Sequence, residues 1–255
     1  MIAARRLSKS LLCFLRFFVR RQWLRIRNLG FNRYCPLCRS HLRCFLAAPW
    51  GNHRADALCP VCECLERDRC GWLFLQRHTD LFNGVRKRFL HIASEWELGR
   101  RIKWTRSIDY LSADLRPIAM AVMDLTDIHF PDNTFDVVYC SHVLSEIPDD
   151  RKALTELQRV LKPTGWAILQ VAIRGDITTE ISPTITPEER ERVYGDAYYV
   201  RMFGRDYPCR LKEAGFAVST VAIRDIFSAR EIQRCRLVRE EASYIDEEIY
   251  VCRKS

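Results

Sequence analysis

Four cysteines stand in two matching pairs, Cys35-Pro-Leu-Cys38 and Cys59-Pro-Val-Cys62, with 20 residues between the pairs. Each Cys-x-x-Cys turn can present two thiolates, and two such turns can complete the tetrahedral coordination that Zn²⁺ prefers. Because protein thiolates would fill all four positions, the pattern predicts a structural zinc site, whereas a catalytic site would keep one position open. Two thiol pairs without a metal are the alternative. Four more side chains could serve as ligands but have no matching partner: His41, Cys44, Cys64 and Cys70.

Two aspartates, Asp114 and Asp124, follow or end apolar segments that are typical of strands. In an open α/β sheet, ligands bind beside the carboxyl ends of the strands, where the strand order reverses. Carboxylates in that place can accept hydrogen bonds from the two ribose hydroxyls of a nucleotide-like ligand. Each aspartate taken alone is equally well explained as a turn residue or a helix N-cap.

The segments that must position these residues alternate between strands and helices. We expect strands at 88–93, 107–113, 120–125, 135–141, 166–173, 216–223 and 248–252, and helices at 97–103 and 149–161. The segment 135–141 is almost wholly apolar, as expected of a parallel strand that is buried on both faces. Alternation of this kind indicates an α/β fold with a doubly wound, mostly parallel sheet.

The stretch from Met123 to Val171 resembles the core of the class I S-adenosylmethionine-dependent methyltransferases (the methyltransferase type 11 group). The similarity comprises Asp124, the turn 131–136, the segment Cys140-Ser141-His142 and the helix end 159–165, in which Thr164 replaces the usual first glycine. The resemblance implies a Rossmann-like, seven-stranded sheet and S-adenosyl-L-methionine as cofactor. The cofactor contacts that it implies are Ala93, Glu95, Asp114, Asp124, Leu125, Ser141 and His142.

Beyond this core, residues 34 to about 252 are similar to a bacterial subfamily that carries an N-terminal zinc knuckle. The shared features are the Cys-Pro-x-Cys pairs, the segment 65–69 (Leu-Glu-Arg-Asp-Arg), the first strand and a late aromatic segment. The similarity implies a zinc-binding knuckle with a linking helix (34–80) and a methyltransferase-like domain (81–255). Outside it, the composition of residues 1–33 predicts a basic, apolar helical arm. An insertion at about 176–207 is predicted to form a lid over the substrate.

The chain departs from the family in two places. The loop after the first strand has no glycine before Gly99, although Ala93 and Ser94 are small enough for a close approach of the cofactor. In the late segment, Tyr198 and Tyr199 replace an Asp-His pair of the subfamily. The second change implies a different substrate, weakened catalysis, or Tyr199 in place of the histidine as a hydrogen-bonding group.

The predicted reaction is methyl transfer to an oxygen or nitrogen of a small, envelope-associated or saccharide-type acceptor. His142 is the first candidate for a catalytic base, followed by Tyr199, Asp206 and Glu146; alternatively, His142 only shapes the cofactor pocket. An RNA methyltransferase and a non-catalytic, cofactor-binding or scaffolding relative are the rival hypotheses. The few aromatic and basic residues around the cysteine pairs favour a small-molecule acceptor over a nucleic acid.

The charge of the chain is concentrated in its N-terminal part. Residues 1–55 hold twelve of the 41 basic residues, and the first acidic residue is Asp56. No apolar run reaches the ~20 residues of a membrane-spanning helix. The arm is therefore expected to pack on the protein itself, to lie on an anionic membrane surface through residues 1–30, or to contact nucleic acid. The cysteine pairs and the cysteines within apolar segments suit a reducing compartment, so we expect a cytoplasmic protein with peripheral membrane contact as an option.

Overall fold

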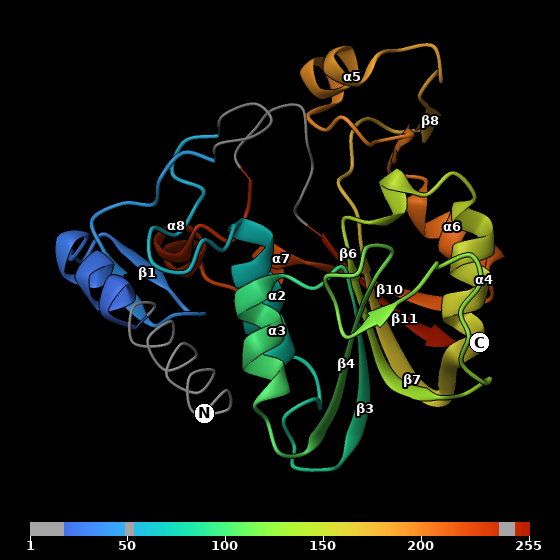
Figure 1. Cartoon of the computed structure of the whole chain (residues 1–255), viewed down its shortest axis with the longest axis horizontal. Coiled ribbons are helices and arrows are strands. Elements are labelled where there is room, and N and C mark those ends of the chain that lie inside the picture. Colours follow the sequence, from blue (N-terminus) through green and yellow to red (C-terminus); the bar gives the residue numbers. More distant parts are fainter. Residues whose placement is uncertain (1–17, 49–53, 240–247) are drawn as a thin grey trace, which may run out of the picture.

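The computed structural model describes residues 18–48, 54–239 and 248–255 and is built around a seven-stranded sheet (Figure 1). The strand order is β10-β11-β7-β6-β3-β4-β5. Strands β3 to β7 pair in parallel, and β11 runs antiparallel to both β7 and β10. The strands are β3 (Lys87–Ile92), β4 (Ile108–Asp114), β5 (Ala121–Val122), β6 (Phe135–Ser141), β7 (Leu161–Gln170), β10 (Phe216–Ala222) and β11 (Glu248–Lys254). The predicted α/β class with a mostly parallel seven-stranded sheet is confirmed.

Two strands differ from the predicted ranges for local reasons. Strand β5 is two residues long, instead of spanning 120–125, because the chain turns away from the sheet after Val122. Asp124 stabilises that turn by accepting hydrogen bonds from the backbone N–H and the hydroxyl of Thr126. Strand β7 begins at Leu161, earlier than expected, since Leu161 already pairs with Phe135 before a register shift in β6.

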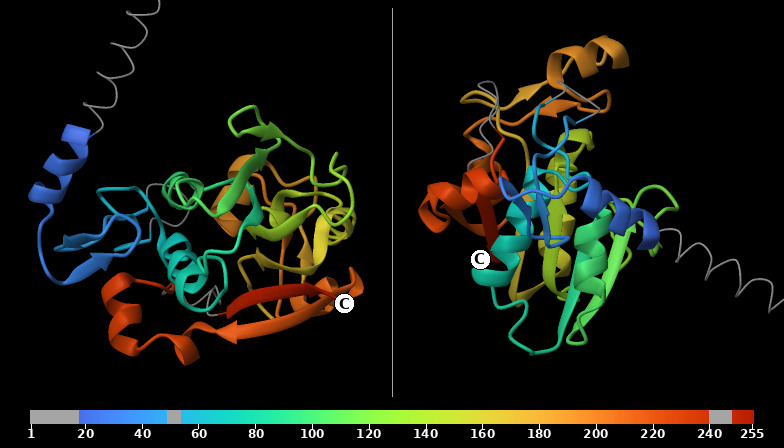
Figure 2. Two further views of the ribbon diagram at one scale, coloured as in Figure 1. Left: turned by 90° about the horizontal axis from the view of Figure 1, so that it is seen from below. Right: turned by 90° about the vertical axis from the view of Figure 1, so that its left-hand side faces the viewer.

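Helices cover both faces of the sheet (Figures 1 and 2). One face carries α4 (Asp150–Val160) and α6 (Tyr207–Glu213), whose apolar residues Leu154, Leu157 and Leu211 pack into one core with the sheet. The other face carries α2 (Glu66–Arg77), α3 (Trp96–Lys103), α7 (Ile223–Ile226) and α8 (Ala229–Cys235). The cysteine-rich segment shares the core of this second face, because Cys35, Cys59, Phe74 and Tyr139 belong to one cluster of buried residues.

The N-terminal part of the described chain lies beside that second face. Residues 18–27 form a helix, which is followed by the antiparallel hairpin β1 (Arg33–Cys35) and β2 (Ser40–Leu42). No helix among residues 18–48, 54–239 and 248–255 has both the length and the apolar character needed to cross a bilayer. The first 17 residues of the predicted arm lie outside the described residues.

The buried guanidinium of Arg69 on α2 joins segments that are far apart in the sequence. Its nitrogens donate to the carbonyl oxygens of Ala57 (2.9 Å), Cys64 (3.0 Å), Cys235 (2.6 Å) and Arg236 (3.0 Å). The side chain is fully buried. A single residue of the linking helix thereby holds the cysteine-rich segment against the C-terminal part of the domain.

The inserted segment after β7 stands at the edge of the domain, at the top of Figure 1. It contains β8 (Thr179–Glu180), α5 (Pro187–Tyr194) and β9 (Arg201–Met202). Arg201 anchors it: its guanidinium donates to the carbonyl oxygens of Leu144, Ile147 and Pro148, next to the short helix η1 (Leu144–Glu146). The insertion is therefore fixed at its base to the loop that follows β6.

Candidate functional site

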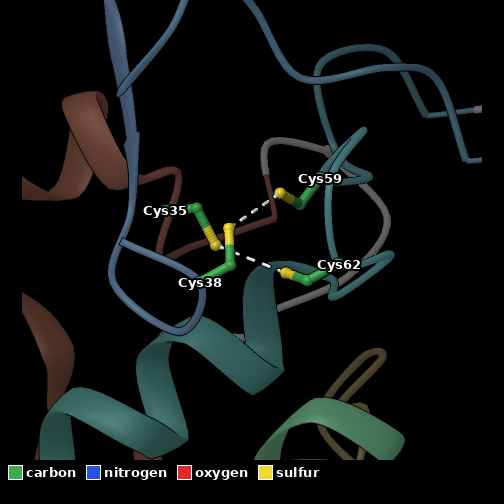
Figure 3. A group of neighbouring side chains, drawn as sticks. All are labelled: Cys35, Cys38, Cys59 and Cys62. Carbon is green, nitrogen blue, oxygen red and sulfur yellow. Dashed lines mark hydrogen bonds between the residues drawn. The ribbon is translucent and has the colours of Figure 1, made fainter. Parts of the chain in front are cut away.

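The two Cys-x-x-Cys turns bring their four thiols together (Figure 3). The four sulfur atoms lie within 4.8 Å of one another, and the pairs Cys35–Cys62 and Cys38–Cys59 are 3.6 and 3.7 Å apart. Four sulfurs at ~2.3 Å from a tetrahedral zinc would be about 3.8 Å apart. In both turns the residue after the second cysteine has a left-handed backbone: φ is 56° for Arg39 and 61° for Glu63. The two turns are thus built alike, as the repeated sequence suggested.

A fifth thiol, that of Cys64, lies against this four-cysteine cluster. Its sulfur is 3.4 Å from the sulfurs of both Cys35 and Cys62, and the residue is buried. The sequence offered Cys64 only as a ligand without a matching partner. Its proximity comes from the tight turn after Cys62, where the N–H of Glu63 donates to the carbonyl oxygen of Cys59.

The segment after β3 occupies the place of the family's glycine-rich loop. Ala93 has a φ of 45°, a left-handed conformation that glycine adopts without strain. Gly99 of α3 leaves room for the hydroxyl of Tyr110, which a Cβ at this position would meet. A left-handed residue thus stands in the loop after β3 although no glycine is present there.

Glu95, a predicted cofactor contact, is hydrogen-bonded within the protein. Its Oε2 lies 2.8 Å from Nε2 of His91, whose Nδ1 lies 3.1 Å from the hydroxyl of Tyr110. Burial opposes ionisation of Glu95, but the interaction with His91 outweighs it and lowers the pKa of the carboxyl. His91 stands fully buried in β3, so this network fixes Glu95 at the carboxyl end of the strand. A role of Glu95 in cofactor binding stays a prediction.

The other acidic candidates lie at the carboxyl ends of neighbouring strands. Asp114 ends β4, and its Oδ1 accepts hydrogen bonds from the backbone N–H (2.8 Å) and Nε (3.3 Å) of Arg116. Asp124 lies in the turn after β5, and the bonds from Thr126 lower the pKa of its carboxyl. The neighbouring Leu125 is buried in the core. The structure thus brings Asp114, Ala93 and Ser141 to one edge of the sheet, with Asp124 and Leu125 at its end.

A pocket opens beside the carboxyl ends of β6 and β7, between α2 and the inserted segment. It encloses about 1050 Å³, part of which is open to solvent. Ser141 and His142 line it from the end of β6, and Tyr199 and Asp196 line it from the insertion. Several further hydrogen-bonding side chains face the pocket: Arg54, Glu66, Arg67, Tyr139, Gln170, Tyr194 and Arg239. Because Ser141 ends the central strand and His142 follows it, they border both this pocket and the strand-end edge that carries Asp114.

Ser141 and His142 have properties that are common at ligand sites. The hydroxyl of Ser141 is buried and makes no hydrogen bond with the described residues. His142 has a left-handed backbone (φ 57°), which costs a non-glycine residue about 1–2 kcal/mol. Burial, followed by the charges of nearby arginines (Arg67, Arg239 and Arg54), lowers the pKa of His142 well below its usual value. The imidazole is therefore neutral at pH 7.

The remaining catalytic candidates do not all reach the pocket. Tyr199 lines it, whereas Tyr198 is 73% exposed. Asp206 is not among the lining residues; its Oδ1 accepts from the N–H and the hydroxyl of Thr178 at the base of the insertion. Partial burial and the charge of Asp196 raise the pKa of Glu146 to about 7. The geometry brings His142 and Tyr199 together at the pocket and leaves Asp206 in a supporting position.

Comparisons with known proteins agree with this architecture. A family model described as a methyltransferase domain matches residues 104–169. A probable methyltransferase of Aspergillus luteorubrus is 52% identical over 44 residues, which cover 16% of this chain and 15% of that protein. The chain thus matches only a small part of that curated relative.

Solved structures are similar to this chain at low sequence identity. An S-adenosylmethionine-dependent methyltransferase from Mesorhizobium loti is 13% identical, with a TM-score of 0.50 over 72% of this chain and 98% of that chain. Phosphoethanolamine N-methyltransferase 2 of Haemonchus contortus, in complex with S-adenosyl-L-methionine, is 15% identical, with a TM-score of 0.48 over 67% of this chain and 49% of that chain. The comparisons thus show a methyltransferase-type fold, and a match to a methyltransferase domain over residues 104–169.

Proposed function

We propose that the protein transfers the methyl group of S-adenosyl-L-methionine to an oxygen or nitrogen atom of a small acceptor. The observation that carries the proposal is the shared position of Ser141 and His142, which border the pocket at the carboxyl end of the central strand of a methyltransferase-type sheet. An acceptor in the pocket would meet the cofactor at these two residues.

The residues at the strand-end edge fit the cofactor. The Asp114 carboxylate would accept hydrogen bonds from the ribose hydroxyls, since its contacts with Arg116 engage Oδ1. Asp124 and Leu125 would border the adenine, and Ala93, Glu95 and Ser141 the methionine part. The buried, unbonded hydroxyl of Ser141 supports this fit, because buried polar groups in native proteins normally have a partner.

The bound cofactor supplies an activated methyl group, so the protein has to bind, align and exclude water. His142, neutral at pH 7, would take the proton of the acceptor hydroxyl or amine as the new bond to the methyl carbon forms. Tyr199 would orient the acceptor by a hydrogen bond, and the inserted segment would cover it. Asp206, hydrogen-bonded to Thr178, would keep that segment in place.

We further propose that Cys35, Cys38, Cys59 and Cys62 bind a structural Zn²⁺. The sulfur–sulfur distances suit a tetrahedral site, and no position remains for a substrate. The metal would hold the cysteine-rich segment in the form that lets Arg54 and Glu66 border the pocket, where they form an ion pair at 3.3 Å. Zinc thiolates and the free thiols of the described residues suit a reducing compartment such as the cytoplasm.

A saccharide-type acceptor, as the bacterial zinc-knuckle subfamily suggests, agrees with the many hydrogen-bonding groups of the pocket. Arg54, Glu66, Gln170, Asp196 and Tyr199 could each bind a hydroxyl group. A non-catalytic role is the second candidate, motivated by the exposed Tyr198 and by Tyr199 in the place of the subfamily's Asp-His pair.

The two candidate functions differ in whether a methylated product is formed. The protein would be incubated with cofactor carrying a deuterated methyl group and with fractions of a cell extract, and labelled products would be sought by mass spectrometry. We expect a labelled product whose formation falls at least ~100-fold in the variant His142→Gln, with cofactor affinity unchanged. The matched control is His129→Gln, because His129 is exposed and lies outside the pocket. Cofactor binding without a labelled product in any fraction would support the non-catalytic role.

A further inference from the structure

An unusual apolar surface covers the outer side of the helix 18–27 and the loop that follows it. We call it the outer stripe. Its members are large hydrophobic residues that are all more than half exposed: Phe18 (51%), Val19 (61%), Trp23 (52%), Ile26 (75%), Leu29 (57%) and Phe31 (76%). Six such side chains within 14 residues form an exposed apolar surface of the kind that marks an interaction site in soluble proteins.

The helix has its polar side toward the protein. At 100° per residue, Arg21 and Arg25 lie roughly opposite Val19, Trp23 and Ile26. The guanidinium of Arg21 pairs with the buried carboxylate of Glu97 on α3 at 2.8 Å. Arg25 donates to the carbonyl oxygen of Cys38 at 2.6 Å and to the hydroxyl of Ser40 at 3.1 Å.

A surface helix of a globular protein normally presents its apolar face to the core. Here Arg21 and Arg25 fix the inward side of the helix to α3 and the four-cysteine cluster. Leu24 also packs against the core, whereas Val19, Trp23 and Ile26 face outward. The helix lies at the periphery of the molecule in Figure 1 and in the left view of Figure 2. The contacts of Arg21 and Arg25 therefore leave the outer stripe on the surface, where an extended surface such as a bilayer can reach it.

The segment that carries the outer stripe contributes only basic charge, and Glu63, from outside this segment, pairs with Arg20 at 3.8 Å. Residues 18–48 include seven arginines and no acidic residue. Arg20 and Arg27 are exposed and flank the stripe, and the guanidinium of Arg27 lies 5.0 Å from the ring centre of Trp23. Apolar side chains with flanking arginines and an aromatic ring are the composition of helices that lie in the interface of anionic membranes.

We propose that the outer stripe and its flanking arginines bind the surface of an anionic lipid bilayer. The side chains of Val19, Trp23 and Ile26 enter the boundary between headgroups and acyl chains, and Arg20 and Arg27 contact lipid phosphates. An RNA partner fits less well, because Val19, Ile26 and Leu29 have no aromatic face on which a base could stack. The proposal is independent of the methyl acceptor.

Flotation of the full-length protein with lipid vesicles tests the proposal. Vesicles of phosphatidylcholine are compared with vesicles that also contain phosphatidylserine, at low and high salt. We expect binding to the anionic vesicles that falls steeply with salt, because screening weakens attraction between exposed charges. The triple variant Val19→Gln/Trp23→Gln/Ile26→Gln should partition at least ~10-fold more weakly, since three apolar side chains no longer leave water.

The matched control is Trp104→Gln, which removes a tryptophan that is 80% exposed at the end of α3. This control should bind vesicles as the wild type does. Circular dichroism establishes that each variant is folded; if the triple variant is not, the pair Arg20→Gln/Arg27→Gln replaces it and should lose binding to anionic vesicles only. The proposal is overturned if the triple variant, or the arginine pair that replaces it, binds anionic vesicles as the wild type does. Binding to single-stranded RNA in the absence of binding to vesicles also overturns it.

Discussion

The substitution Arg69→Met tests whether the cysteine-rich segment and the methyltransferase domain form one cooperative unit. Methionine keeps much of the side-chain volume but removes every hydrogen bond of the guanidinium. The carbonyl oxygens of Ala57, Cys235 and Arg236 would lose their bonds to this residue, whereas that of Cys64 still accepts from the N–H of Cys59. Leaving a buried acceptor unpaired costs about 1–3 kcal/mol, and relief of the buried charge offsets part of the sum.

We therefore expect the free energy of unfolding to fall by about 3 kcal/mol, a large part of the ~5–15 kcal/mol of a typical domain. Arg69→Lys should not restore it, because an ammonium cannot reach carbonyl groups on several sides at once. The matched control is Arg77→Met on the same helix, where the guanidinium is 48% exposed and pairs with Glu231 at 2.7 Å. Exposed ion pairs contribute ~1 kcal/mol or less.

The assay is equilibrium unfolding in urea of the metal-loaded protein, followed by tryptophan fluorescence. If Arg69→Met and Arg77→Met shift the midpoint by the same small amount, Arg69 does not hold the segments together and the reasoning fails. Two separate transitions already in the wild type would contradict the single cooperative unit.

Three further predictions concern packing, metal and pH. Gly71→Ala should destabilise the protein by about 1–3 kcal/mol in urea unfolding, because the new Cβ collides with the hydroxyl of Tyr139; a more stable variant would contradict this. Cys59→Ser should lower the zinc content measured by plasma emission and the melting temperature together, whereas the exposed Cys44→Ser should change neither; unchanged zinc in Cys59→Ser would contradict the site. The pKa of His142 is depressed in the folded state. Below about pH 6.5 the unfolded chain therefore binds an extra proton, so the free energy of unfolding falls as the pH is lowered. His142→Gln should reduce this dependence on pH, and an equal dependence in the variant and the wild type would contradict the depressed pKa.

The sheet could be predicted because strand signals are local. The apolar segments around Leu90, Leu111 and Val138 form the strands that they predict. The strand predicted at 120–125 was too long, since the capping of its turn by Asp124 competes with pairing. The approach of the cysteines within each pair could also be predicted, because each pair lies within a single turn.

The contacts that join distant segments could not be predicted. Arg69 bonds to Cys235, which lies 166 residues further along the chain, and no periodicity encodes such a contact. Arg201 of the inserted segment anchors it to the loop after β6 and does not face the pocket. Cys64 and the His91–Glu95 pair depend on the folded geometry in the same way. The sequence shows which residue types are present, but only the fold determines which residues they contact.

Calorimetric titration with S-adenosyl-L-methionine tests the central claim most directly. We predict binding in the micromolar range and a loss of at least ~10-fold in Asp114→Asn, which corresponds to ~1.4 kcal/mol. The control is Asp109→Asn on the same strand, where the carboxylate is 55% exposed and pairs with Arg88; its affinity should equal that of the wild type. No binding at millimolar cofactor, or equal affinity of wild type and Asp114→Asn, would contradict the account.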